Sequence, residues 1–360
     1  MTRTTLALMP GDGIGPEIAA ATRVVLEAAS DRFDLDLAFR VIEVGFAALE
    51  ATGSTFPETA FKAIEGCDGI VLGPVSHNAY PTREDGGLNP SGELRKRLDL
   101  FANIRPARSR AGIVPRAGTP LDLVIVRENT EGFYADRNLH RGPGEIMVTP
   151  DVSLAFRRIT RDASMRIARQ AFALAETRGR HVTAVHKANV MRVSDGLFLE
   201  CCRSVAADYP DTRYDESLVD AMCAHLVRSP DLYDVIVTTN MFGDILSDLA
   251  SELAGGLGLA ASLNAGERMA MAQAQHGSAP DLAGRDIANP ASLIGSAGML
   301  LVWLGARRGD DAMQAAGAAI EAALEECLTS PGHRTRDLGG RAGTRDLAHA
   351  VGARLTDKTV

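Results

Sequence analysis

Short apolar segments alternate with longer amphipathic segments along almost the whole chain, and this order limits the possible folds more than any other feature. The apolar segments are rich in β-branched residues, which is typical of strands buried on both faces. Such alternation predicts an α/β protein in which helices cover a mainly parallel sheet. We expect strands at residues 6–9, 69–73, 121–126, 181–186 and 234–239. We expect helices from Pro16 to about Ala29 and at 160–178, 195–207, 244–253, 290–305 and 310–328.

The chain is long enough for two lobes, because 360 residues exceed one ordinary domain. One boundary is expected near residue 100 and the other near 254, where the glycine-rich run Gly255–Gly258 resembles a hinge. The first lobe is then discontinuous, with residues 1–100 and 254–360, and the second lobe holds residues 101–253. A polar segment rich in Gly and Pro at 138–144 predicts a protruding hairpin.

The composition indicates a globular protein with a large core, since 46% of the residues are hydrophobic. A net charge of −8 argues against a surface for nucleic acids or anionic membranes. Among the five cysteines the only close pair is Cys201 and Cys202, so neither a disulfide framework nor a C-x-x-C site is expected. The sequence shows no signal-peptide pattern and no apolar run of membrane-spanning length. We therefore expect a soluble protein located in the cytoplasm.

Two aspartates, Asp244 and Asp248, follow the predicted strand at 234–239 and a predicted turn at 240–243. Because they are four residues apart, they share one face of the helix that begins there. Open α/β sheets bind ligands at the carboxyl ends of their strands, and carboxylates without His or Cys suit Mg²⁺ or Mn²⁺. The alternative is a solvated acidic helix face that complements the helix dipole.

Three arginines form a second group of candidates. Arg127 follows the predicted strand at 121–126 and is expected to project from its carboxyl end, whereas Arg95 and Arg105 lie earlier in the chain. The planar guanidinium binds carboxylates bidentately and stays charged, so three arginines that converge would suit a di- or tricarboxylate. The alternatives are a surface arginine at Arg95 and a structural ion pair between Arg127 and Glu128.

Single residues suggest acid–base chemistry more weakly. Lys187 follows the predicted strand at 181–186, and a lysine at a strand end can have its pKa lowered enough to move protons. Tyr134 is a candidate general acid, and Asp220 stands at the start of a predicted helix. The alternatives are a surface lysine, a half-buried aromatic residue and a helix-start aspartate.

Motifs at residues 11–17, 94–106, 126–134, 186–190, 219–222, 240–248, 276–290 and 335–340 follow one another along nearly the whole chain. In this order they resemble the β-decarboxylating dehydrogenases, which act on isocitrate, homoisocitrate, 3-isopropylmalate, tartrate and D-malate. The resemblance implies an isopropylmalate dehydrogenase-like architecture with two α/β/α lobes and a mainly parallel mixed sheet, not a true Rossmann fold. Residues 1–100 with 254–360 would form the cofactor-side domain, and residues 101–253 the domain for substrate, metal and dimerisation.

The resemblance also implies a role for each candidate. The substrate carboxylates would be bound by Arg95, Arg105 and Arg127. A divalent cation, Mg²⁺ or Mn²⁺, would be held by Asp220, Asp244 and Asp248. Lys187 would deprotonate the 2-hydroxyl of the substrate, and Tyr134 would protonate the enol carbon after loss of CO₂. In this family the lysine and the first aspartate come from the neighbouring subunit, which implies a homodimer with shared active sites.

NAD would bind along a family-specific loop with the residues His276, Gly277, Ser278, Ala279, Asp281 and Asn289. Asp281 predicts NAD, because an acidic residue accepts the ribose hydroxyls and repels a 2′-phosphate. NADP-dependent relatives usually have Lys-Tyr where this chain has Asp281 and Leu282. The early glycines at 11, 13 and 15 do not complete G-x-G-x-x-G, because Pro16 takes the last position.

Two departures from the family concern the substrate pocket. Gln273 stands where the family usually has glutamate, and an amide keeps the hydrogen bonding but loses the charge. The segment 89–94, with Ser91 and Gly92, is polar and small, whereas isopropylmalate enzymes typically present adjacent leucines there. An isopropyl group against it would forfeit roughly 1–3 kcal/mol of apolar contact. We predict an isocitrate-, homoisocitrate- or malate/tartrate-like substrate, with 3-isopropylmalate as the alternative.

Two other classes of function compete with this prediction. A non-catalytic regulatory subunit of the same fold should lack a metal aspartate, the lysine or the tyrosine, and this chain retains all of them. A phosphate-binding enzyme that uses the early glycine loop lacks the Lys-Ser/Thr of a P-loop.

Overall fold

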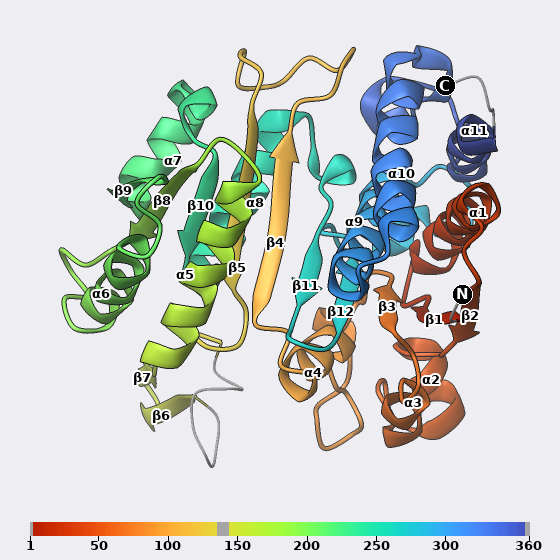
Figure 1. Cartoon of the computed structure of the whole chain (residues 1–360). Coiled ribbons are helices and arrows are strands. Elements are labelled where there is room, and N and C mark those ends of the chain that lie inside the picture. The colour runs from red at the N-terminus through yellow and green to blue at the C-terminus, as the bar shows by residue number, and fades with distance from the viewer. Residues whose placement is uncertain (1–2, 135–143, 357–360) are drawn as a thin grey trace. The chain divides into compact units, whose positions relative to one another are not determined.

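The computed structural model describes residues 3–134 and 144–356, and the chain divides into two compact units (Figure 1). Unit 1 comprises Met1–Leu98, Arg110–Val114 and Gly256–Val360. Unit 2 comprises Asp99–Ser109 and Pro115–Gly255. The short segment Arg110–Val114 therefore belongs to unit 1, although it lies inside the range that the sequence assigns to the second lobe.

Unit 1 contains a sheet with the strand order β2-β1-β3-β12-β11, in which all neighbours are parallel except β11 and β12. Its strands are β1 (Thr4–Met9), β2 (Leu37–Val41), β3 (Gly69–Leu72), β11 (Leu263–Ala265) and β12 (Ala270–Gln273). Its helices are α1 (Gly15–Phe33), α2 (Phe46–Thr52), α3 (Glu58–Ala63), α4 (Pro90–Arg97), α9 (Ala291–Arg308), α10 (Asp311–Thr329) and α11 (Thr344–Thr356). Helix α9 packs on β3 and β12, α1 and α10 pack against α9, and α11 packs against α1 and α10.

Unit 2 contains a sheet with the order β4-β5-β10-β8-β9, in which only β4 is antiparallel to its neighbour. These strands are β4 (Ala102–Arg108), β5 (Asp122–Glu128), β8 (His181–His186), β9 (Arg213–Leu218) and β10 (Val235–Thr238). The helices are α5 (Arg161–Glu176), α6 (Ser194–Ala206), α7 (Val219–Arg228) and α8 (Asn240–Ala254). Helices α5 and α6 pack together, as do α7 and α8, and both pairs contact the sheet. The predicted α/β class with a mainly parallel mixed sheet is thus confirmed.

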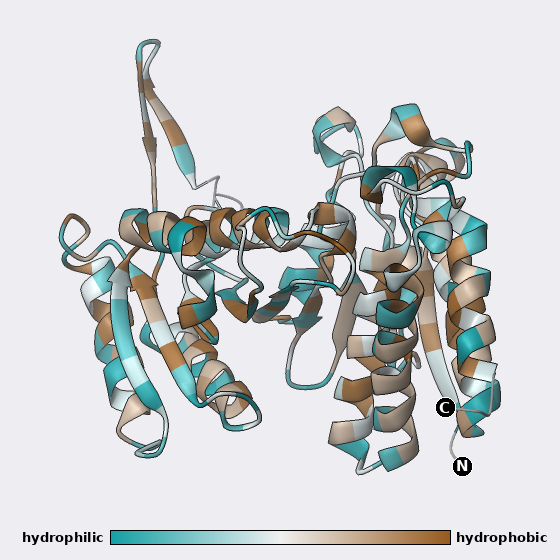
Figure 2. Cartoon of the chain, turned by 90° about the horizontal axis from the view of Figure 1, so that it is seen from above, coloured by the Kyte–Doolittle hydropathy of each residue, from teal (hydrophilic) through white to brown (hydrophobic). Residues whose placement is uncertain are grey.

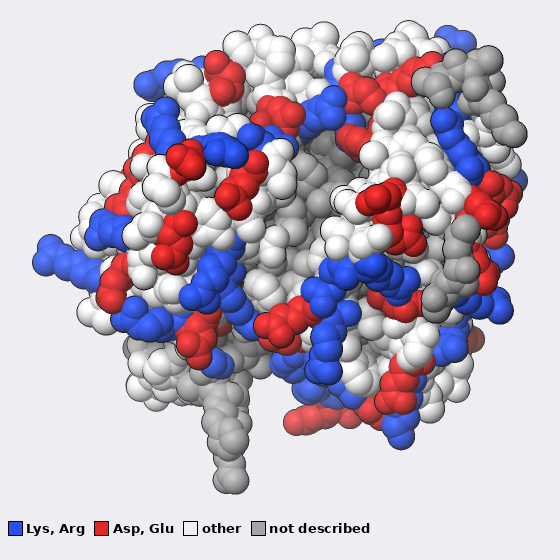
Figure 3. Space-filling view, in the orientation of Figure 1, with Lys and Arg blue, Asp and Glu red and all other residues white. Residues whose placement is uncertain are grey.

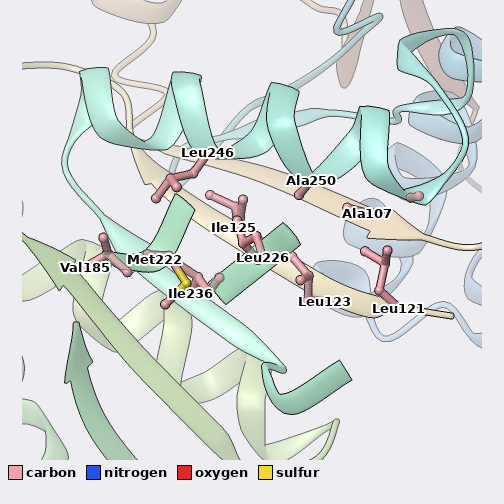
Figure 4. Close-up of a cluster of buried hydrophobic side chains, with 11 residues drawn as sticks. Ala107, Leu121, Leu123, Ile125, Val185, Met222, Leu226, Ile236, Leu246 and Ala250 are labelled. Carbon is pink, nitrogen blue, oxygen red and sulfur yellow. The ribbon is translucent and has the colours of Figure 1, made fainter. Parts of the chain in front are cut away.

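The core of unit 2 positions helix α8 (Figure 4). Leu246, Ala250 and Ala254 recur every four residues and face the sheet, where they meet Ile125 and Ile236. Burial of one such leucine or isoleucine stabilises the fold by roughly 1.5–3 kcal/mol. Since these residues occupy one face of the helix, Asp244 and Asp248 are left on another face.

Helix α8 begins at Asn240, so the turn predicted at 240–243 is wrong. Its first turn is closed by a hydrogen bond of 2.9 Å from the backbone nitrogen of Gly243 to the carbonyl oxygen of Thr239. Thr239 has extended dihedral angles, so the chain passes from strand to helix within one residue. Helix α1 also exceeds its prediction, because it continues beyond Ala29 to Phe33.

A two-stranded hairpin, β6 (Glu145–Thr149) with β7 (Val152–Ala155), projects from unit 2 (Figure 2). Its strands are exposed along their whole length, and they carry apolar side chains such as Met147, Val148 and Leu154. Most of the hairpin predicted at 138–144 falls on residues 135–143, which lie outside the described part of the chain. Among the described residues, no helix is long and apolar enough to cross a membrane.

Candidate active site

Arg127 occupies the centre of a polar network in unit 2. It lies inside β5 and not after the strand, and it is paired with Asn103 of β4 and Thr238 of β10. Although it is charged, it is only 2% exposed. Its Nε and Nη2 donate to Oδ1 of Asn240 at 2.9 and 2.7 Å, and its Nη1 forms an ion pair with Asp244. These acceptors replace the water that a buried guanidinium loses.

A glycine makes room for this arginine. A Cβ atom added to Gly243 of α8 would lie 2.6 Å from Cγ of Arg127 and 2.7 Å from its Cβ. The glycine of the segment 240–248 therefore serves close packing and not a turn. The ion pair that the sequence suggested between Arg127 and Glu128 is not the one that forms, because Glu128 accepts hydrogen bonds from Thr130 instead.

Arg105 joins the two aspartates. Its Nη1 lies 3.1 Å from Oδ1 of Asp244 and 3.4 Å from Oδ1 of Asp248, and it donates to Ser247 Oγ at 2.7 Å. The two carboxylates thus share one face of α8, as their spacing predicts. Burial and the adjacent Arg127 lower the pKa of Arg105 to about 10, a value at which it stays charged at neutral pH.

Tyr134 belongs to the same network. Its hydroxyl donates to Oδ2 of Asp244 at 2.7 Å and accepts from Nη2 of Arg127 at 2.9 Å. The phenol is therefore held between a cation and a carboxylate, an arrangement that fixes where its proton points.

Lys187 and Asp220 form a second group in unit 2. Nζ of Lys187 lies 2.5 Å from Oδ1 of Asp220, and this hydrogen bond lowers the pKa of the aspartate. The lysine backbone nitrogen donates to Asp195, a fully buried carboxylate that also pairs with Arg157. Asp195 and Arg157 thus anchor the segment that carries the lysine, and no sequence motif pointed to them.

The predicted metal ligands belong to two groups: Asp244 and Asp248 lie in the arginine network, and Asp220 lies beside Lys187. Asp244 and Asp248 have side chains that are 38% and 52% exposed, so their oxygens are accessible. Among the described residues no cluster of three or more His, Cys, Asp or Glu side chains has a spacing that could hold a metal ion. One chain therefore brings together two of the three predicted ligands, and Asp220 stands apart with Lys187.

In unit 1, Ser91 and Arg95 meet Gln273. The serine hydroxyl donates to Oε1 of Gln273 at 2.9 Å, and Nη2 of Arg95 donates to the same oxygen at 3.0 Å. Helix α4, which carries both residues, is capped by Asn89, whose side chain accepts from the backbone nitrogen of Gly92. The predicted specificity segment and the unusual glutamine therefore touch.

The predicted cofactor loop packs on the early glycine turn of unit 1. A Cβ atom at Gly13 would lie 2.0 Å from the carbonyl oxygen of Ser278, and Gly13 has a φ of +59°, so only glycine fits there. The backbone nitrogen of Ile14 donates to that same oxygen at 2.9 Å. Among the early glycines, Gly13 thus serves the contact between two loops.

Three further residues of this loop are candidates for cofactor binding. Asn289 donates to Asp337 at 2.9 Å, which joins the loop to the segment 335–340. Nε2 of His276 is buried and has no hydrogen-bond partner among residues 3–134 and 144–356. Burial also lowers the pKa of His276, so its neutral form is favoured. Asp281 is exposed.

The sequence motifs contain some of these partners, but the sequence predicted no role for them. Asn240 and Ser247 lie inside the motif at 240–248, and both bind arginines. Asn103 is fully buried and accepts from Nε of Arg105 at 3.1 Å. Amides and hydroxyls at such positions could have been recognised by the need of each buried guanidinium for several acceptors.

On the face in Figure 3 basic and acidic side chains are interspersed.

Known proteins resemble this chain over nearly its whole length. It is 42% identical to 3-isopropylmalate dehydrogenase of Archaeoglobus fulgidus, over 97% of this chain and 99% of that protein. It is also 42% identical to isocitrate/homoisocitrate dehydrogenase of Thermus thermophilus, over 96% of this chain and 97% of that protein. The crystal structure of isocitrate dehydrogenase from Methylococcus capsulatus superposes with a TM-score of 0.85 at 37% identity, over 98% of this chain and all of that one.

The family model described as isocitrate/isopropylmalate dehydrogenase matches residues 5–351. This match covers almost the full length of both units. The chain belongs to the isocitrate/isopropylmalate dehydrogenase family of oxidoreductases.

Proposed function

We propose that this protein catalyses the NAD-dependent oxidative decarboxylation of a 3-carboxy-2-hydroxy acid with the help of Mg²⁺ or Mn²⁺. The observation that carries the proposal is the network of Arg105, Arg127, Tyr134, Asp244 and Asp248 in unit 2. In this network the two arginines can bind substrate carboxylates, and the two aspartates can bind a hard metal ion. The tyrosine can donate its phenol proton. The family supports the same reaction class.

The residues present fit both absent groups. Asp244 and Asp248 supply only oxygen ligands, which Mg²⁺ and Mn²⁺ prefer, and Asp220 of a second subunit would complete the set. Nε2 of His276 is buried without a hydrogen-bond partner in the described part of the chain, and Asp281 is acidic and exposed. Both features fit a dinucleotide whose ribose carries two free hydroxyls. When bound, NAD⁺ supplies the hydride acceptor and the metal ion supplies a Lewis acid for the 2-oxygen of the substrate.

Residues of the chain supply the proton transfers of this reaction. Lys187 accepts the proton of the 2-hydroxyl as C2 loses a hydride, which bound NAD⁺ would accept with its electron pair. The bond from C3 to its carboxylate then breaks, CO₂ leaves, and the electron pair of that bond forms an enolate. Tyr134 donates its proton to C3 of the enolate, which yields the 2-oxo acid. Arg95, Arg105 and Arg127 hold the carboxylates of the substrate during these steps.

The preferred substrate is proposed to be isocitrate- or homoisocitrate-like, with a malate- or tartrate-like acid next. The polar surroundings of Ser91 support this order, since its hydroxyl is already engaged with Gln273 and offers an isopropyl group no apolar contact. The alternative is 3-isopropylmalate, the substrate in the name of the Archaeoglobus fulgidus relative. Because Asp220 of one subunit would complete the metal site of another, the proposed enzyme is a homodimer.

Steady-state kinetics test the proposal. Wild type is assayed with isocitrate, homoisocitrate, 3-isopropylmalate, D-malate and tartrate, each with NAD⁺ and NADP⁺ and with Mg²⁺ or EDTA. We expect NADH formation that EDTA abolishes, with kcat/KM at least about tenfold higher for NAD⁺ than for NADP⁺. Equal kcat/KM for both cofactors would refute the NAD assignment, and no turnover of any acid would favour a non-catalytic subunit.

Lys187→Ala tests the catalytic assignment. We expect kcat to fall at least about 100-fold, because general acid–base catalysis contributes that much or more. Lys62→Ala is the matched control, since Lys62 is an exposed lysine of α3 in unit 1 and should leave kcat unchanged. Metal-dependent NADH formation at the wild-type rate by Lys187→Ala would contradict the role of the lysine.

A further inference from the structure

The carboxylate of Asp195 lies between the backbone of Lys187 and the side chain of Arg157. Asp195 belongs to the first turn of α6 and is fully buried. Its Oδ2 accepts from the backbone nitrogen of Lys187 at 2.5 Å, and its Oδ1 pairs with Nη1 of Arg157. A carboxylate that has left water needs such a cation close by. The backbone of Lys187 is therefore held by a group whose charge Arg157 balances.

Arg157 also holds the start of helix α8. Its side chain is 7% exposed, and its Nη2 donates to Oγ1 of Thr239 at 3.0 Å. Thr239 directly precedes Asn240, the residue whose amide oxygen accepts from Arg127. One guanidinium thus joins the segment that carries Lys187 with the first turn of α8.

The loop of Tyr134 packs against the same arginine. The next residue along the chain, Arg158, forms two backbone hydrogen bonds with Gly132, at 2.9 and 3.1 Å. The guanidinium carbon of Arg157 also lies 5.5 Å from the ring centre of Phe133, a distance at which an aromatic ring attracts a cation. Arg157 therefore contacts three segments that carry residues of the proposed mechanism.

These contacts differ in strength. The contact with Asp195 joins two charges, whereas the contact with Thr239 is a hydrogen bond to a neutral hydroxyl, and charge-assisted bonds are the stronger ones. Lysine has a flexible four-carbon stem, so the place of Nζ depends on the backbone from which the stem starts. The carbonyl oxygen of Lys187 accepts from the backbone nitrogens of Val190 and Met191 at 3.0 and 2.9 Å. Loss of the arginine is therefore expected to displace the lysine more than it displaces α8.

We propose that Arg157 is a positioning residue for Lys187. Through Asp195 it fixes the backbone from which the lysine reaches the 2-hydroxyl of the substrate. The inference rests on the proposed function and deepens it, because that lysine serves the active site of the neighbouring subunit in the proposed homodimer. Arg157 therefore acts on the neighbouring active site, although it lies beside Thr239 and the Tyr134 loop of its own.

A double-mutant cycle tests the route through the lysine. Arg157→Met should lower kcat at least about tenfold and change KM less than about threefold, because the arginines that bind the substrate are kept. In the Lys187→Ala background the same change should lower kcat less than about twofold further, since the lysine that Arg157 positions is already gone. An equal loss in both backgrounds would overturn the proposal.

Three variants separate charge from packing. Arg157→Lys keeps the cation and should lower kcat less than about threefold. Thr239→Val removes only the second contact, and it should also lower kcat less than about threefold. Arg178→Met is the matched control, because it breaks ion pairs of 2.7 Å with Asp122 and Asp234 in the same unit and should leave kcat unchanged. A loss in Arg157→Lys or Thr239→Val as large as in Arg157→Met would contradict the role of the ion pair.

Amide hydrogen exchange tests the contact without turnover. Because the backbone nitrogen of Lys187 donates to Asp195, its hydrogen should exchange at least about tenfold faster in Arg157→Met than in wild type. Arg178→Met should show the wild-type rate. If Arg157→Met does not fold, Arg157→Gln takes its place in both tests, since the amide keeps a donor for Asp195. Unchanged exchange would overturn the role of Arg157, whether or not turnover is seen.

Mixed dimers locate the defect and keep this inference separate from the proposed function. Co-expression of Tyr134→Phe with Lys187→Ala should raise activity above that of either homodimer, because one site then combines an intact tyrosine with an intact lysine. Arg157→Met should be restored by Tyr134→Phe and not by Lys187→Ala. Restoration by Lys187→Ala would place the effect of Arg157 in its own site and overturn the proposal. If wild type oxidises none of the acids, the proposed function is wrong, and amide exchange still decides the role of Arg157.

Discussion

Glu131 is a buried carboxylate whose protonation is tied to the loop that carries Tyr134. It is 3% exposed, and its oxygens accept hydrogen bonds from the backbone nitrogen and hydroxyl of Thr160 at 2.8 and 2.9 Å. Burial raises the pKa of Glu131 from 4.5 to about 7 despite these bonds. The backbone oxygen of the same residue accepts from Asn240, a partner of Arg127.

The raised pKa predicts a loss of stability at high pH. Because the pKa in the folded chain exceeds the unfolded value, the contribution of Glu131 to the free energy of unfolding is complete below about pH 4.5 and is lost as the pH rises through about 7. We expect the wild-type free energy of unfolding to fall by on the order of 2 kcal/mol relative to Glu131→Gln between about pH 5 and pH 8. Urea unfolding at several pH values measures this difference. Parallel curves for the two proteins would show that Glu131 does not titrate in this range.

Among the elements of unit 2, helix α8 and strand β5 are brought close by a single glycine. Gly243 leaves the space that the buried Arg127 fills, and Asn240 of the same helix accepts from that guanidinium twice. Further along the helix, Leu246 and Ala250 belong to the buried cluster that contains Ile125 (Figure 4). The helix thus offers an apolar face to the core and a polar end to the arginines.

Gly243→Ala tests this contact. Alanine normally stabilises a helix interior by about 1 kcal/mol over glycine, but here its Cβ would lie 2.6 Å from Cγ of Arg127. We expect a net destabilisation of about 1–3 kcal/mol and a raised KM for the acid substrate. The matched control is Gly196→Ala on α6, where a Cβ meets nothing within 4 Å and should be neutral or stabilising. Denaturant unfolding and steady-state kinetics distinguish the two variants, and equal stabilities would refute the packing role.

For the whole molecule, the predicted ligand set is incomplete within one chain. Unit 2 brings Asp244 and Asp248 together, and among the described residues no group of three such ligands forms. The same unit projects the hairpin β6–β7, on which Met147 is 69% exposed. Exposed apolar strands of this kind are typical of protein–protein interfaces, and both features agree with the proposed homodimer.

Met147→Asp is expected to weaken the dimer and to lower activity with it, because a charge would be buried in the apolar contact. Light scattering after size exclusion, together with specific activity at several protein concentrations, measures both effects. Val114→Asp is the control, since Val114 is an apolar residue of unit 1 that is 85% exposed. A dimer of unchanged stability in Met147→Asp would exclude the hairpin from the interface.

The sequence alone determined the fold class and the motifs that show the family, because these depend on local periodicity and on residue identity. It also predicted strands β1, β3, β5, β8 and β10, but not β2, β4, β9, β11 and β12. The four-residue spacing of Asp244 and Asp248 was enough to predict their shared helix face. Which groups touch across the chain depends on tertiary packing. Only the structure put Gly243 against Arg127 and Gln273 against Arg95, because residues 116 and 178 positions apart meet only when strands and helices assemble. Backbone register and side-chain volume decide such contacts, and neither can be read from local patterns.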